Sequence, residues 1–355
     1  MTPSFVPLLA LLAVAASVTA CHRGGEQANP SVALRWELHD AGGIGLISSL
    51  VRCGPLAYLA DFQQKIRPLD LAQRRTLPAV NLEGPPLALA ADCERRRLFV
   101  VYPPRRGNME VHEVHAESGT VVRRHVLPPT QVQGVYFIPP SSLVVGGLVR
   151  PKQSVALRQT TPQSPFAGAH LAVRLDLDSG TSEPVLPSYD DSCIGAGACW
   201  DVSVAPDTRG WWAAQPTSMA IAHYDHLGNP PRLISVASPG LLRSGRSIPL
   251  GTMAEEGVRW HSENSTLHSV FRTAERVVVV HARPRVGPDW QLGQQLSFTV
   301  LMNSYTPDGR LVRADVPLPD LPVGGDADGV WAIDYGSAGR TNGVTALTLV
   351  KVLVP

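Results

Sequence analysis

The stretch from Leu87 to Leu127 alternates between short apolar runs and short polar turns. It contains two apolar runs separated by a polar turn, then a second polar turn, an alternating run, a glycine turn and a last short run. This pattern predicts four antiparallel strands joined by three short turns. A sheet of four short strands cannot bury both of its faces alone, so the pattern also predicts that similar sheets pack against it.

Looser copies of this unit occur before and after it. Four stretches share an alternating strand that ends in a polar residue and a glycine and is followed at once by another strand: 111–127, 172–186, 221–236 and 301–318. An earlier stretch, 66–80, keeps the strand and lacks the glycine. The turn glycines can adopt the positive φ that tight hairpins require; they are Gly119, Gly180, Gly228 and Gly309. A strand pair precedes each stretch, which makes five units, and a sixth begins at Gly329.

The two ends of the chain complete the pattern. Residues 32–39 form a candidate strand without a partner in the first unit, and residues 345–354 form a long apolar strand in the last. Rings of blades commonly close by pairing such strands, which removes two sheet edges at once. The sequence therefore predicts an all-β protein, a six-bladed β-propeller over 32–355. Seven blades are the alternative, if the long unit 257–319 contains an extra sheet.

Four insertions stretch the spacing between the repeats: 149–169, 188–198, 237–256 and 283–295. They fall in connections between predicted strands, where propellers usually build their binding surfaces.

The turn pattern at Leu175–Thr181 and Tyr305–Val312, a strand followed by a glycine turn and a further strand, resembles six-bladed propellers of the TolB-like and NHL-like type found in bacterial lipoproteins. The resemblance covers roughly 32–355 and extends to architecture only. It implies a fold and identifies no reaction, because propellers serve as enzymes, scaffolds and receptors alike.

The N-terminal sequence predicts an export signal. Residues 5–18 form an uncharged apolar run of the length found in secretory signals, and the run is too short to span a bilayer comfortably. It ends in Val18-Thr19-Ala20-Cys21, which resembles the bacterial lipobox. The resemblance implies a signal peptide over 1–20, cleavage after Ala20, and diacylglyceryl and fatty-acyl (palmitate-type) modification of Cys21, with several acyl chains giving stable anchoring. Ordinary cleavage at the same bond is the alternative.

The residues after Cys21 bear on localisation. By resemblance to enteric lipoproteins, His22 in the position of the usual aspartate favours the outer membrane and a periplasmic environment. The segment 21–31 is polar and rich in glycine, and it reads as a flexible tether.

Composition limits the choice of partners. Charged residues make up 17% of the 355 residues and the formal net charge is +1. Because phosphate binding needs a concentrated basic surface, this balance gives no support to a nucleic-acid partner.

The cysteines fit an oxidising compartment, because four of them remain once Cys21 is set aside. Cys193 and Cys199 flank a glycine-containing loop that can fold back, which predicts a disulfide. Cys53 and Cys93 lie at matching positions, each in the polar turn before an apolar strand. Neighbouring blades could bring these two together, or the equivalent turns could stand too far apart for a bridge.

Tryptophans give the candidate ligand contacts. Trp200 with Asp201, Trp260 and Trp331 each lie near the predicted start of a unit, close to the central channel. There they could line a site for a sugar, peptide or aromatic group, or they could pack between blades. Trp290 lies in an insertion and is the candidate for an exposed contact.

Acidic and histidine pairs are weaker candidates. Asp190 and Asp191 could bind calcium, although calcium needs six to eight oxygen ligands and these are two. His223 and Asp225 share one face of a strand, where a solvated outer strand and its turn are the simpler interpretation. No metal or other cofactor is otherwise indicated.

No G-x-S-x-G, S-x-x-K, G-x-x-x-x-G-K or H-E-x-x-H motif occurs in the chain. The leading hypothesis is therefore a lipid-anchored binding protein with a protein, peptide or glycan partner. The alternative is a calcium-dependent hydrolase or lactonase-like propeller enzyme, whose site would be assembled from single residues on separate blades.

Overall fold

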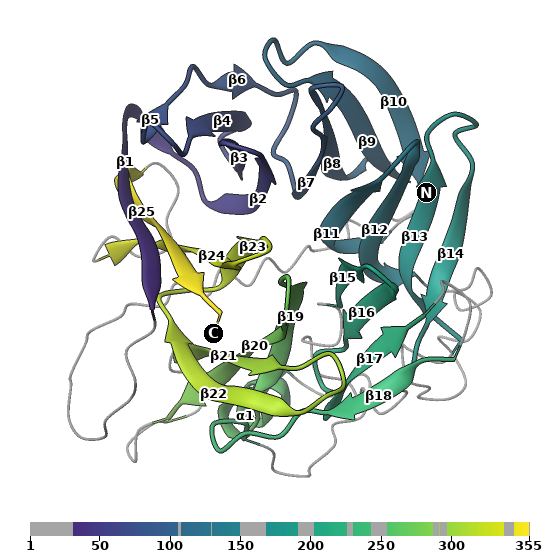
Figure 1. Ribbon diagram of the computed structural model, residues 1–355, viewed down its shortest axis with the longest axis vertical. Helices are drawn as coiled ribbons and strands as arrows, with labels where there is room; N and C mark the ends of the chain where they lie inside the picture. Colours follow the sequence, from purple (N-terminus) through teal and green to yellow (C-terminus); the bar gives the residue numbers. More distant parts are fainter. Residues whose placement is uncertain are drawn as a thin grey trace, which may run out of the picture.

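The computed structural model describes residues 31–105, 108–128, 130–149, 168–190, 202–225, 230–242, 254–286, 291, 297–336 and 344–354. Within these ranges six antiparallel sheets surround a common centre (Figure 1). The molecule is a six-bladed β-propeller, as the repeats predict. The long unit 257–319 forms one blade and contains no second sheet among its described residues.

The first three blades follow the chain order. Blade 1 consists of β2 (Ile47–Cys53), β3 (Leu56–Asp61), β4 (Lys65–Asp70), β5 (Arg75–Thr76) and β6 (Val80–Asn81). Blade 2 consists of β7 (Ala88–Asp92), β8 (Arg97–Arg105), β9 (Asn108–His115) and β10 (Val121–Leu127). Blade 3 consists of β11 (Gln131–Ile138), β12 (Ser142–Val149), β13 (His170–Asp176) and β14 (Ser182–Pro187).

The second half repeats the plan. Blade 4 consists of β15 (Ser203–Asp207), β16 (Gly210–Ala214), β17 (Ala220–Tyr224) and β18 (Arg232–Ser235). Blade 5 consists of β19 (Thr266–Arg272), β20 (Val277–Arg285), β21 (Ser297–Tyr305) and β22 (Leu311–Leu318). Blade 6 consists of β23 (Pro322–Gly325), β24 (Gly329–Asp334), β25 (Val344–Leu353) and the N-terminal β1 (Val32–Ile44).

The ring closes in blade 6, where the two ends of the chain meet. β1 pairs with β25 in antiparallel register, from Val32 opposite Val352 to Ile44 opposite Val344. This confirms the predicted pairing of the first and last strands. β1 is thus the outermost strand of blade 6, and it covers the edge that β25 would otherwise expose.

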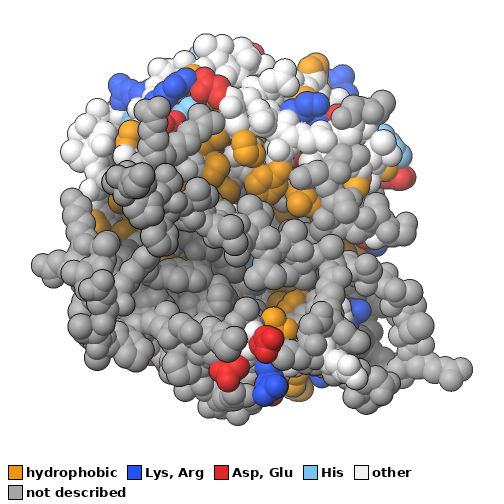
Figure 2. Space-filling view, turned by 180° about the vertical axis from the view of Figure 1, so that it is seen from behind, with side chains coloured by type: hydrophobic (Ala, Val, Ile, Leu, Met, Phe, Trp, Pro, Cys, Tyr) orange, Lys and Arg blue, Asp and Glu red, His pale blue; other side chains and the backbone are white. Residues whose placement is uncertain are grey.

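The core lies between neighbouring blades. In blade 5, Val277 and Val279 pack toward blade 4 with Trp212, whereas Val278 and Val280 pack toward blade 6. All four valines are fully buried. A strand that is covered on both faces reads as a continuous apolar run, which explains the sequence Val277–Val280. In the view from behind, some described hydrophobic side chains also reach the surface, in the upper middle part of the picture (Figure 2).

The two faces of the disc carry connections of different length. On one side, which we call the hairpin face, first strands turn into second strands and third strands into fourth strands, through connections of two to seven residues. The opposite side, the loop face, carries every connection of nine or more residues between the described strands: 150–169, 188–202, 236–265, 286–296 and 335–343. The described strands that flank the insertions predicted from the sequence thus all end at the loop face where an insertion begins or finishes.

The described chain begins and ends at the hairpin face. The backbone N–H of Leu353 donates to the carbonyl of Ser31 at 2.9 Å, and that of Val354 donates to Asp328 in the turn between β23 and β24. Turn glycines on this face have the expected positive φ: 70° at Gly119, 73° at Gly180 and 100° at Gly309. Gly228 lies outside the described residues.

One predicted strand is wrong. The stretch around Trp260 forms the helix α1 (Ala254–Glu263) on the loop face. Glu255 and Glu256 lie in its first turn, where carboxylates stabilise the helix dipole. Asn264 donates to the carbonyl of Trp260 at 2.9 Å and so satisfies a carbonyl at the helix C-terminus. In the part of the chain that the structure describes, no helix has the length and apolar character needed to cross a membrane.

Candidate functional site

A six-residue pattern, D-x-x-G-x-W, recurs at the first hairpin of blades 4 and 6. It runs from Asp207 to Trp212 and from Asp326 to Trp331. In each copy the aspartate accepts a hydrogen bond from the indole N–H of its own tryptophan, at 3.1 Å in blade 4 and 2.9 Å in blade 6. Backbone N–H groups of the turn donate to the same carboxylates, at Thr208 and at Asp328 and Gly329.

The glycine of the pattern allows a close approach between strands. A Cβ at Gly210 would lie 1.9 Å from the carbonyl oxygen of Tyr224 on the third strand, and a Cβ at Gly329 would lie 2.3 Å from that of Val352. Only glycine fits such a position without moving the backbone.

Each of these aspartates also contacts the next blade. Arg272, the last residue of β19, donates from Nε to Asp207 at 3.2 Å. Arg52, near the end of β2, donates to Asp326 at 3.0 Å, and Lys351 donates to the same carboxylate at 2.9 Å. Each aspartate therefore joins its own hairpin to the neighbouring blade, once between blades 4 and 5 and once between blades 6 and 1.

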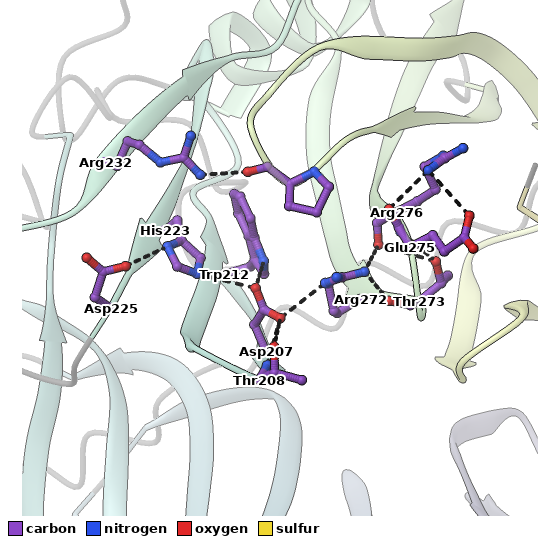
Figure 3. A network of polar contacts seen from close by, with 11 residues as sticks. Asp207, Thr208, Trp212, His223, Asp225, Arg232, Arg272, Thr273, Glu275 and Arg276 are labelled. Carbon is purple, nitrogen blue, oxygen red and sulfur yellow. Dashed lines mark hydrogen bonds and ion pairs between the residues drawn. The ribbon is translucent and has the colours of Figure 1, made fainter.

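His223 extends the blade 4 contact into a larger network (Figure 3). Its Nε2 lies 3.3 Å from Asp207 Oδ2 and its Nδ1 lies 3.2 Å from Asp225 Oδ1. The imidazole is buried, with 6% of its side chain exposed, whereas Asp225 is 76% exposed. The sequence correctly placed His223 and Asp225 on one face, but the interpretation of a solvated outer strand is wrong for the histidine.

Burial and the neighbouring groups together shift the pKa values of His223, Asp207 and Asp326. Desolvation lowers the pKa of His223 below its usual value, more than the neighbouring carboxylates of Asp207 and Asp225 raise it. Burial alone would raise the pKa of Asp207. Hydrogen bonds from Thr208 and Trp212 and the charge of Arg272 outweigh that effect and hold it below its ordinary range. The pKa of Asp326 is lowered in the same way, against its burial, by Lys351, the turn N–H groups, Trp331 and Arg52.

The network favours a structural role. An open hollow of about 600 Å³ adjoins it, lined by Thr208, Arg209, Gly210 and Asp225. The Nε2 and Nδ1 atoms of His223 face the carboxylates of Asp207 and Asp225, so both ring nitrogens lie within the network. The arrangement is suited to holding blades 4 and 5 together.

A disulfide takes the equivalent place between blades 1 and 2. Cys53 is the last residue of β2 and Cys93 directly follows β7, each at the first hairpin of its blade, and the two are bonded with a Cα separation of 5.3 Å. The second of the two alternatives, that the turns stand too far apart, is thus excluded. Between blades 5 and 6 the corresponding turns meet through the backbone, where the N–H of Ala274 donates to the carbonyl of Ala327.

On the loop face, buried side chains hold the bases of long connections. Gln215 is 1% exposed, and its Oε1 accepts the backbone N–H groups of Tyr189 and Asp190 at 3.1 and 3.2 Å. The hydroxyl of Tyr189 donates to the carbonyl of Ala220 at 2.8 Å. The start of the connection 188–202 is therefore fixed to blade 4.

The connection 236–265 is held in a similar way. Asp315 on β22 accepts the backbone N–H of Gly240 at 2.7 Å, and a Cβ at Gly240 would collide with that carboxylate. Leu242 and Ser265 are joined by two hydrogen bonds, which bring the two ends of this connection together.

Two of the candidate ligand tryptophans, Trp260 and Trp331, lie within the described residues, and both are buried. Trp260 lies on α1 and is 6% exposed, whereas Trp331 lies on β24, is 2% exposed, and packs beneath Lys351 at 5.2 Å. Trp331 belongs to the second strand of its blade and not the first, because β23 precedes it. Their burial favours the packing alternative for these two side chains. The other candidates lie outside the described residues: Cys21, Asp191, Cys193, Cys199, Trp200, Asp201 and Trp290.

The innermost strands carry few acidic groups. Across β2, β7, β11, β15, β19 and β23, the carboxylates are those of Asp92 and Asp207, and both accept hydrogen bonds from their own turns. Among the described residues, no group of three or more histidine, cysteine, aspartate or glutamate side chains is placed to hold a metal ion. No described feature thus singles out the calcium-dependent enzyme alternative.

Comparison with known proteins supports the architecture. No family model matches the sequence, and no curated protein matches it. The fold is similar to that of a member of the DUF4221 family from Bacteroides vulgatus, with a TM-score of 0.62 and 12% identity, over 91% of this chain and 97% of that one. It is also similar to the RRP9 WD40 repeats, with a TM-score of 0.51 and 10% identity, over 91% of this chain and 99% of that one. At such identities the similarity establishes the propeller fold alone.

Proposed function

We propose that this protein is a lipid-anchored lipoprotein of the bacterial envelope, sorted to the outer membrane by the residues after Cys21, and that its propeller binds a protein, peptide or glycan through the loop face. The observation that carries the proposal is the asymmetry of the disc. All connections of nine or more residues join strands at the loop face, whereas the hairpin face carries connections of two to seven residues.

The fixed bases of these connections support a binding role. Gln215 and Tyr189 hold one of them, and Asp315 and Ser265 hold another. Anchoring the ends of a loop reduces the number of conformations that must be lost when a partner binds. A propeller with such loops supports binding or scaffolding, and the described residues supply no arrangement that favours catalysis.

The position of Ser31 suggests how the propeller is oriented relative to the membrane. Ser31 lies at the hairpin face, so a tether from Cys21 would join the propeller there. A flexible tether of that length spans about 15 to 20 Å on average. The hairpin face would then lie toward the membrane, and the loop face would be presented away from it.

The anchoring part is tested by metabolic labelling of the full chain with an alkyne-tagged fatty acid. We expect label on the wild-type chain and none on Cys21→Ser, with the wild type in the membrane fraction and the variant released. A labelled Cys21→Ser chain, or an unlabelled wild type, would refute anchoring and leave the binding part standing.

The binding part is tested by photo-crosslinking in the native host. A crosslinking residue is placed at Met219 or Glu256 on the loop face, and at Glu117 or Asp178 on the hairpin face as matched exposed controls. We expect discrete adducts from the loop-face positions only. Adducts that form equally from both faces, or only from the hairpin face, would overturn the assignment.

A further inference from the structure

The open hollow beside the blade 4 network has two oppositely charged side chains in its wall. Its volume is about 600 Å³, and it is lined by Thr208, Arg209, Gly210 and Asp225. This volume lies within the range of small-molecule sites. Arg209 is exposed in the turn between β15 and β16, and Asp225 directly follows β17. Both charged groups are therefore accessible to a ligand from solvent.

Strand pairing brings these residues together at the hairpin face. Trp211 on β16 lies opposite Tyr224 on β17, so Gly210 and Asp225 are the next pair toward this face. A Cβ at Gly210 would lie 1.9 Å from the carbonyl oxygen of Tyr224 and 3.0 Å from the carbonyl carbon of Asp225. The wall of the hollow at this position is thus bare backbone, and no side chain there separates a ligand from the two charges.

The two charges in the wall do not pair with each other. Among the described residues, the guanidinium of Arg209 has no hydrogen-bond or ion-pair partner. Asp225 is 76% exposed, and its Oδ1 lies 3.2 Å from Nδ1 of the buried His223. In the same described part of the chain, no donor reaches Asp225 Oδ2. A cation and an anion that line one hollow without pairing are each available to a ligand group of opposite charge.

The equivalent turn of blade 6 has a different arrangement of charge. Its D-x-x-G-x-W pattern carries Asp328 at the position of Arg209. On its third strand, Lys351 lies opposite the tryptophan, as His223 does in blade 4. Lys351 is 3.3 Å from Asp328, so the charge of that turn is compensated within its own blade. In blade 4 the same position of the turn is a cation that its own hairpin leaves unpaired.

We propose that this hollow binds a small zwitterion, a molecule with a primary ammonium group and an oxyanion a few atoms apart. The planar guanidinium of Arg209 would donate to the oxyanion, and the ammonium would donate to Asp225. A ligand with one charge alone would be attracted by one of these residues and repelled by the other. Free amino acids and the phosphoethanolamine head groups of lipids share this chemistry. The site lies on the hairpin face and is independent of the proposed partner surface on the loop face.

The test compares four small probes by titration calorimetry on the full chain as Cys21→Ser, in which position 21 cannot be acylated. O-phosphoethanolamine and β-alanine carry both charges, whereas ethanolamine and ethyl phosphate carry charge of one sign only. We expect a Kd on the order of 1 mM for at least one zwitterion, and binding about tenfold weaker or less for both other probes. Tighter binding of O-phosphoethanolamine would assign the source to lipid head groups, and tighter or equal binding of β-alanine would assign it to free amino acids.

Variants connect the binding to the two charged residues. Arg209→Gln and Asp225→Asn should each weaken zwitterion binding about tenfold or more. Arg74→Gln and Asp178→Asn remove exposed charges from other turns of the hairpin face and should leave the Kd unchanged. Thr208→Trp fills the hollow beside both charges and should abolish binding in a protein that still unfolds cooperatively. No saturable binding of either zwitterion, equal binding of ethanolamine or ethyl phosphate, or unchanged binding by Arg209→Gln would overturn the proposal.

Discussion

At the scale of single residues, buried carboxylates with several donors join neighbouring blades. Asp207 has 3% of its side chain exposed, and it accepts from the turn, from Trp212 and from Arg272 of the next blade. A buried charge without its partner costs more than the pair contributes when intact. The contacts of Asp207 should therefore be sensitive to removal of the arginine.

We expect Arg272→Met to reduce the free energy of unfolding by about 3 kcal/mol, because it leaves Asp207 charged and buried. Arg96→Met is the matched control. Arg96 pairs with Glu117, and both side chains are about three-quarters exposed, so its loss should cost less than about 0.5 kcal/mol. Urea unfolding of the two variants measures the difference, and equal losses would contradict this account of the blade 4 to 5 contact.

Buried histidines predict that the free energy of unfolding depends on pH. Burial is the largest cause of the lowered pKa of His223, in the network of Asp207, and of His125 in blade 2. As the pH falls below about 6.5, the unfolded chain binds protons that the folded chain binds only at lower pH, so the free energy of unfolding should fall. Urea midpoints between pH 7.5 and 5.5 measure this. His223→Gln should reduce the slope, and a wild-type midpoint that rises with acidity would be inconsistent with buried neutral imidazoles.

At the scale of elements, the sequence predicted the hairpins but missed β23 and α1. The glycines at 119, 180 and 309 indicated turns because tight hairpins need a positive φ. β23 was missed because its sequence, Pro322–Gly325, has no alternation. Gly324 and Gly325 are required there by close approach, since a Cβ would lie 2.6 Å from the carbonyl oxygen of Leu50 or 2.7 Å from the ring of Phe271.

α1 was missed for a different reason. Its Trp260 and the apolar residues nearby fit a buried strand as well as a helix over so short a stretch, and the tertiary contact with blade 5 decides between them. The D-x-x-G-x-W pattern was also missed. Its repeated spacing could have indicated two equivalent turns, but the contact that each aspartate makes with an arginine of the next blade is not visible in the local sequence.

The pattern's glycine gives a prediction at this scale. Gly210→Ala should destabilise the fold by about 3 kcal/mol or more, because its Cβ would lie 1.9 Å from the carbonyl oxygen of Tyr224. Gly180→Ala, at a turn with similar need for positive φ and open space around the new Cβ, should cost only about 1 to 2 kcal/mol. Thermal and urea unfolding compare the two, and an equal cost would show that the close approach does not limit position 210.

The disulfide gives a second prediction for elements. It closes a sequence separation of 40 residues, for which the chain-entropy relation gives a stabilisation of about 4 kcal/mol. The double variant Cys53→Ser, Cys93→Ser should lose a comparable amount in urea unfolding, while its near-ultraviolet circular dichroism stays native. A loss below about 1 kcal/mol would mean that the seam between blades 1 and 2 is held by its core alone.

At the scale of the whole molecule, ring closure sets the position of both chain ends. β1 and β25 pair in blade 6, which places Ser31 and Val354 at the hairpin face. Closure was predictable because the first strand lacked a partner in its own unit and the last strand was long and apolar. The gathering of the long connections on one face could be assigned only when the strand order within each blade was known.

The proposed orientation of the propeller is tested most directly by measuring the distance of each face from the membrane. A fluorophore is attached through a clickable amino acid at Met219 on the loop face or at Ala327 on the hairpin face, in lipidated protein reconstituted into vesicles that contain an acceptor lipid. Energy transfer should be stronger from Ala327 than from Met219, and should disappear for both in Cys21→Ser. Equal transfer from the two positions, or stronger transfer from Met219, would contradict the presentation of the loop face away from the membrane.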